Sequence, residues 1–126
     1  MRYLMTAVLI LVGIIHLLPL AGVSGAERIQ SLYGVTLGDP NVVILMRHRA
    51  VLFGLLGTFF IVAAFVPALQ LSALILGTIS VISFLLLAWS TGGYNASIAR
   101  VVTADWIALA LLLVGFVAYA LLRRRF

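Results

Sequence analysis

The fold is decided by residues 42–89, which read VVILMRHRAVLFGLLGTFFIVAAFVPALQLSALILGTISVISFLLLAW. Pro67 divides this stretch into two apolar runs, 42–66 and 68–89, and each run is longer than the roughly 20 helical residues that cross a hydrocarbon core. In lipid, the backbone groups of a segment must be satisfied within that segment, so such runs form helices. Because only a tight turn at Pro67 separates them, we expect two antiparallel neighbouring helices.

Two further apolar runs flank this pair, at about residues 3–23 and 101–122. We therefore predict an all-α fold in which residues 1–126 form a single domain, an integral membrane antiparallel four-helix bundle without β-sheet. The long connection lies between the first and second spans. The start of the chain also fits a cleavable signal peptide that ends at Ser24-Gly25-Ala26. His16 is unusual in such a peptide and favours a retained span.

The composition supports lipid as the solvent of this chain. Of its 126 residues, 65% are hydrophobic and 9% are charged, whereas a soluble domain carries roughly 25% charged residues. The basic residues are all arginine and form no basic stripe with interleaved aromatics, so we expect no nucleic-acid partner. The chain has no cysteine, which excludes disulfides, thiolate catalysis and a cysteine-bound zinc. We expect no metal and no cofactor.

The arginines near the two ends of the chain indicate its orientation. Four spans place both termini on one side, where Arg2 and the three arginines at 123–125 gather. The positive-inside rule makes that side cytoplasmic. The other four arginines belong to the opposite side, so each side has four arginines. Two of these four, Arg47 and Arg49, fall within the second span rather than in a loop, which favours cytoplasmic termini.

Helical periodicity of about 100° per residue assigns a face to each span. The small residues of the second span share one sector with Arg47, and they are Ala50, Gly54 and Gly57. Arg49 lies on the opposite sector, together with Phe53 and Phe60. Membrane helices pack through small residues, because lipid provides no hydrophobic force between helices. We therefore expect Arg47 to face the bundle and Arg49 to face lipid and reach the headgroups.

The same periodicity gives each of the other spans one small or polar stripe. The stripes contain Thr6, Gly13 and His16 in the first span, Ala73, Gly77 and Ser80 in the third, and Asp105, Ala108, Gly115 and Tyr119 in the fourth. Ionisable inward side chains thus lie at similar depth on three helices. We predict that His16, Arg47, His48 and Asp105 line one outward-facing polar pocket, and that residues 26–33 form a helix that roofs it.

Two interpretations of this cluster remain open. An ionisable residue inside a span costs about 2.5–3.5 kcal/mol to insert, which makes it a functional candidate. In the alternative interpretation, Arg47 and Asp105 form a structural ion pair that fixes helix register, while His16 is hydrogen-bonded to a backbone carbonyl. The run Arg47-His48-Arg49 concentrates more charge than register requires, and this keeps the functional interpretation open.

Three classes of function fit these features. In the first, the protein binds or transports an anionic or amphipathic lipid-soluble molecule; Arg47 holds the acidic head group, and His16 and His48 supply hydrogen bonds. In the second, the chain is a non-catalytic accessory or assembly subunit. In the third, it is a membrane-embedded enzyme with His16 as general base and Arg47 stabilising negative charge. The sequence leaves the ligand and a possible homo-oligomer open.

Three segments in the first half of the chain resemble a known group of proteins. They are HLLP at 16–19, LYGV at 32–35 and MRHRA at 46–50. These segments resemble small uncharacterised four-helix bacterial membrane proteins that are distantly similar to DoxX-like proteins. Some members carry the label phosphopantetheine adenylyltransferase, an enzyme with a His-x-Gly-His motif that this chain lacks. The resemblance implies four spans and a bacterial inner membrane, without an established activity.

Overall fold

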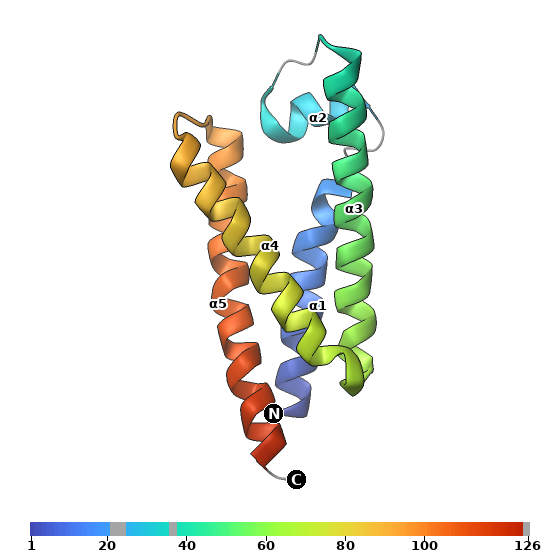
Figure 1. Ribbon diagram of the computed structural model, residues 1–126, viewed down its shortest axis with the longest axis vertical. Coiled ribbons are helices and arrows are strands. Elements are labelled where there is room, and N and C mark those ends of the chain that lie inside the picture. Colours follow the sequence, from blue (N-terminus) through green and yellow to red (C-terminus); the bar gives the residue numbers. More distant parts are fainter. Residues whose placement is uncertain (21–24, 36–37, 125–126) are drawn as a thin grey trace.

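A computed structural model describes residues 1–20, 25–35 and 38–124 of the chain. Its long helices are α1 (Arg2–Leu17), α3 (Pro40–Phe65), α4 (Gln70–Thr91) and α5 (Ala96–Arg124), which run alternately up and down (Figure 1). A short helix, α2 (Ala26–Tyr33), follows α1, and a single turn, η2 (Pro67–Leu69), joins α3 to α4. The described part of the chain contains no β-strand. The predicted all-α antiparallel bundle is confirmed.

Within the described ranges, four segments are long and apolar enough to cross a membrane. They are Arg2–Leu20, Pro40–Phe65, Pro67–Thr91 and Ala96–Arg124. They agree with the four predicted spans, although residues 21–23 of the first predicted span lie outside the described part. Many of their large apolar side chains are exposed on the outside of the bundle, where lipid is the only favourable solvent for them. The chain is therefore a multi-pass membrane protein in contact with a bilayer.

Local sequence sets where the helices begin and end. Asp39 caps α3, because its Oδ1 accepts a hydrogen bond of 2.9 Å from the Asn41 N–H, and Pro40 occupies the first helical position. Val66 is extended, as expected for a residue before proline, and this ends α3. Gly34 adopts a left-handed conformation with φ 64° and ends α2. These signals place α2 and the start of α3 at the same end of the bundle (Figure 1).

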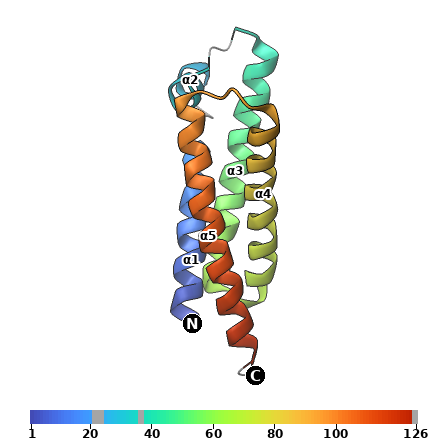
Figure 2. The ribbon, with the colours of Figure 1, turned by 90° about the vertical axis from the view of Figure 1, so that its left-hand side faces the viewer.

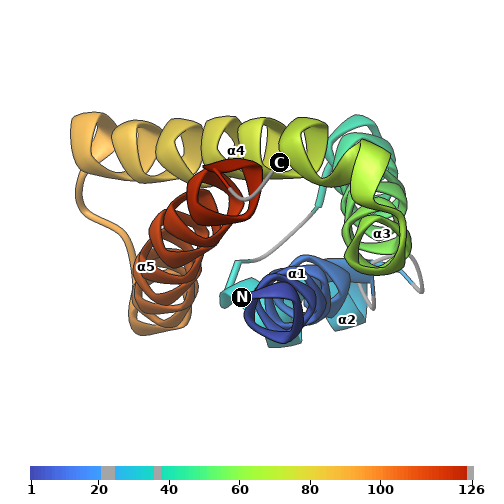
Figure 3. The ribbon, with the colours of Figure 1, turned by 90° about the horizontal axis from the view of Figure 1, so that it is seen from below.

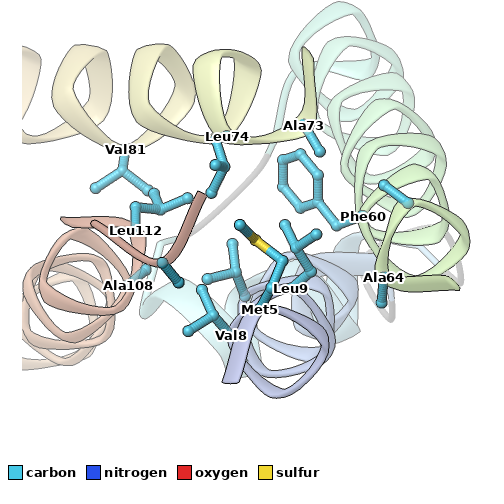
Figure 4. Packing of buried hydrophobic residues seen from close by; sticks show 13 residues of the cluster. Met5, Val8, Leu9, Phe60, Ala64, Ala73, Leu74, Val81, Ala108 and Leu112 are labelled. Atoms are coloured by element: carbon cyan, nitrogen blue, oxygen red, sulfur yellow. The ribbon is translucent and has the colours of Figure 1, made fainter. Parts of the chain in front are cut away.

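The first span lies inside the bundle, where it contacts both α3 and α5 (Figure 2). The apolar core is built from all four long helices (Figure 4). Its fully buried members include Met5, Leu9, Phe60, Leu74 and Leu112. In contrast, α4 packs mainly on α5 and runs away from α3 after their shared turn, as seen from below in Figure 3.

Helices α1 and α3 approach each other closely at two glycines. A Cβ atom on Gly57 would lie 2.8 Å from the Gly13 carbonyl oxygen, and a Cβ on Gly13 would lie 3.0 Å from the Gly57 carbonyl oxygen. Both distances are too short for a side chain, so the two backbones are in direct contact. Ala50 and Gly54 are also buried. The prediction that the small residues of the second span pack against the bundle is confirmed.

This contact predicts different costs for the same substitution at two helical glycines. Gly57→Ala should destabilise the protein by about 1–3 kcal/mol, because its Cβ meets a backbone carbonyl that cannot move independently. Gly77→Ala is the control, because its Cβ would meet only side-chain ends, at 3.1 Å from Leu112 and 3.3 Å from Phe60. Thermal unfolding in one detergent measures both variants. Equal unfolding temperatures would show that the α1–α3 contact is not limiting.

Candidate functional site

A cavity of about 240 Å³ lies at the α2 end of the bundle. All five helices contribute to its lining, which is mainly apolar. Its polar side chains are His16, Tyr33, Arg49, Ser97, Arg100 and Asp105, and its apolar walls include Ile15, Phe53 and Phe84. The structure thus brings together His16 and Asp105, as predicted from their helical stripes.

His16 is buried at the wall of this cavity, and its ring makes two hydrogen bonds and two aromatic contacts. Its Nδ1 lies 2.9 Å from the Val12 carbonyl oxygen, which can only accept, so Nδ1 carries the proton and donates. Nε2 then accepts a 3.1 Å hydrogen bond from the Ser80 hydroxyl. The ring stacks on Phe53 at 5.7 Å and meets Phe60 edge-on at 4.9 Å, measured between ring centroids. The bond to a backbone carbonyl agrees with the alternative, structural interpretation of His16.

Arg49 is one of the two arginines in the cavity lining. Its Nη1 donates a 2.8 Å hydrogen bond to the Tyr33 hydroxyl, which uses one of the five N–H donors of the guanidinium. The guanidinium carbon lies 5.3 Å from the centroid of the Tyr33 ring and 4.5 Å from that of Phe53, within range of cation–π attraction. Its charge also acts on the Asp105 carboxyl. Arg49 therefore links α3 to α2.

This geometry corrects the predicted roles of the arginines. Arg47 and His48 are exposed and do not line the cavity, whereas Arg49 is half-buried within it. The expected inward position of Arg47 and the lipid-facing position of Arg49 were both wrong. Helix α3 has two adjacent buried faces. The face with the small residues packs against α1, and the neighbouring face lines the cavity. Arg49 shares this second face with Phe53.

Helix α2 covers the cavity, as the sequence analysis predicted for residues 26–33. Its Leu32 and Tyr33 contribute to the lining. Asn95, which was not predicted, attaches this roof to α5: its side-chain amide donates to the carbonyl oxygens of Tyr33 at 2.8 Å and Gly34 at 3.1 Å. The Asn95 Oδ1 accepts a 2.8 Å bond from the Ile98 N–H and caps α5. One side chain thereby joins the end of α2 to the start of α5.

The site has a net positive wall inside a mainly apolar cavity. Two arginines, Arg49 and Arg100, line it together with a single carboxylate, Asp105. Arg100 was not among the predicted site residues. Across the residues that the structure describes, no group of three histidine, aspartate or glutamate side chains is arranged to hold a metal ion.

Fold and site together define a multi-pass membrane bundle with a roofed, cationic cavity. Comparisons with protein-family models, with curated proteins and with solved structures found no match to this chain.

The role of Asn95 can be tested by hydrogen–deuterium exchange. Asn95→Ala removes both bonds to the end of α2 and the cap of α5, so amide exchange in 26–34 should accelerate. Thr103→Ala serves as the control, since this exposed side chain bonds only to the Ala99 carbonyl within α5. If both variants exchange at the wild-type rate in α2, then Asn95 does not hold the roof.

Proposed function

We propose that this protein binds or transports an amphipathic, lipid-soluble molecule whose acidic head group enters the cavity beside Arg49. The observation that carries the proposal is the position of Arg49 on a half-buried wall between two aromatic rings. A guanidinium forms strong, charge-assisted hydrogen bonds with carboxylate or phosphate, often in pairs. With Arg100 also in the lining, the cavity favours an anion over a cation.

The remaining lining suits a ligand that is mostly apolar. Sites for small molecules are typically hydrophobic and carry a few polar groups that fix orientation. Here Phe53 and Phe84 supply large apolar surfaces next to Arg49. Electrostatic attraction between an acidic head group and Arg49 is stronger in such surroundings than in water, because the effective dielectric constant is lower. The lining therefore matches a ligand with a charged head group, which the arginines bind, and an apolar body, which contacts the apolar side chains.

Two other classes of function have less support. A general base needs an available nitrogen, and both ring nitrogens of His16 are hydrogen-bonded to Val12 and Ser80. The arginine suggested for stabilising charge, Arg47, is exposed outside the cavity lining. A closed core would favour the non-catalytic accessory or assembly subunit, whereas this bundle contains a cavity beside Asp105.

The membrane and the orientation belong to the same proposal. We propose a bacterial inner membrane with both termini in the cytoplasm, so that the cavity opens toward the outer side. Arg2 and the arginines near the end of α5 support this orientation. The resemblance to DoxX-like membrane proteins agrees with it and stays a prediction.

A titration in nanodiscs of phosphatidylcholine tests the proposed ligand class. Hexadecanoate is the probe, and its uncharged methyl ester is the matched control ligand. Arg49→Gln should weaken hexadecanoate binding at least about tenfold, because a hydrogen bond to a charged group contributes about 1.5–3 kcal/mol and about 1.4 kcal/mol is tenfold in affinity. Arg47→Gln removes the same charge two residues away on an exposed face, where we expect an effect below about 1 kcal/mol.

Two outcomes would contradict the proposal. Equal weakening by Arg47→Gln and Arg49→Gln would mean that general surface charge, and not the cavity, attracts the acid. Equal affinity for the acid and its methyl ester would remove the role of the anionic head group.

A further inference from the structure

The cavity is small for a complete amphipathic molecule. Its volume of about 240 Å³ is below the roughly 300–1,000 Å³ of typical ligand clefts, so it accommodates a head group and little more. A second hollow of about 360 Å³ adjoins it and shares three lining residues with it: Tyr33, Arg49 and Phe84. The two hollows therefore adjoin each other along these three side chains.

The second hollow, called the side groove from here on, is almost entirely apolar. Beyond the three shared residues, its lining consists of Val35, Val42, Met46 and Ile98. Val42, Met46 and Arg49 follow each other at spacings of four and three residues, which places them along one face of α3. The opposite wall is formed by Phe84 of α4 and Ile98 of α5. The side groove is thus lined by residues of α3 and α4. These two helices diverge toward the α2 end of the bundle (Figures 1 and 3).

Arg49 stands at the junction between the two spaces. It lines both the cavity, together with Asp105 and Arg100, and the side groove, together with Val42 and Met46. A molecule with its acidic head group on Arg49 would place its first methylene groups at this junction. The positive charge of Arg49 and the apolar lining of the side groove together match a single-chain acid. A long-chain carboxylate or an alkyl phosphate is such an acid.

We propose that the side groove holds the hydrocarbon tail of the acid bound at Arg49 and admits it sideways from the bilayer, between α3 and α4. This inference rests on the proposed function and adds a route and a chain-length requirement to it. Entry from the bilayer has a physical advantage, because the tail passes from lipid to apolar protein without exposing its methylene groups to water. A route through the aqueous side would expose the whole tail.

A paired titration separates the side groove from the cavity. Met46→Trp fills the side groove, and Ile44→Trp is the matched control on the same helix, where Ile44 is 64% exposed. Met46→Trp should weaken hexadecanoate and hexadecyl phosphate at least about tenfold, since an overfilled space rejects the tail. It should leave hexanoate, whose short chain fits the cavity, unchanged. Ile44→Trp should change the affinity of none of these ligands, whereas Arg49→Gln should weaken all of them.

The outcomes distinguish the two proposals. If Arg49→Gln weakens hexadecanoate but Met46→Trp behaves like Ile44→Trp, then the role of the side groove is wrong and the proposed function stands. If Arg49→Gln affects neither the long nor the short acid, then the proposed function itself is wrong. Tail-labelled photo-crosslinking on the wild-type protein provides a measurement without any variant. Crosslinks should appear at Val42, Met46 and Ile98, and crosslinks confined to the Ile44 face of α3 would overturn the inference.

Discussion

The direct backbone contact between Gly13 of α1 and Gly57 of α3 is the constraint on which the remaining structure depends. Because lipid is as apolar as the side chains, helices in a membrane gain attraction chiefly through such close approach. The contact draws α1 and α3 together along their length and brings His16, three residues beyond Gly13, against Phe53 and Phe60. The position of His16 at the base of the cavity is a consequence of this pairing.

The second close pairing, between α4 and α5, explains why a cavity exists. Leu74 of α4 approaches Gly115 so closely that a Cβ on this glycine would lie 2.8 Å from its Cδ2 atom. Helix α1 packs on α3 and α5, and α4 packs mainly on α5, whereas α4 runs away from α3 after the turn at Pro67 (Figure 3). Large side chains, among them Phe53 and Phe84, line the cavity. Arg49 occupies a half-buried position there and donates one hydrogen bond to Tyr33.

Most of the fold, and half of the predicted site, could be derived from the sequence. The length and hydropathy of the apolar runs predicted the four spans. The small-residue stripes correctly predicted that His16 and Asp105 face the same interior. The predicted inward position of Arg47 and outward position of Arg49 were reversed. The reason is that small residues mark only the side of α3 where its backbone touches another helix. The face of α3 that lines the cavity carries large residues. Phe53, on the same face as Arg49, was the feature of the sequence that could have indicated this. Asn95 could not be found, because its partner Tyr33 is 62 residues away and is reached only in the folded bundle.

Solid-state NMR tests the central claim, that Arg49 receives the acidic head group, most directly. The measurement is the dipolar coupling between an isotope-labelled carboxyl carbon of hexadecanoate and labelled guanidinium nitrogens of arginine in nanodiscs. Arg49→Lys and Arg47→Lys each keep the positive charge and remove one labelled guanidinium. The account predicts a strong coupling that disappears in Arg49→Lys and persists in Arg47→Lys. A coupling that survives in Arg49→Lys, or its absence in the wild-type protein with ligand bound, would contradict it.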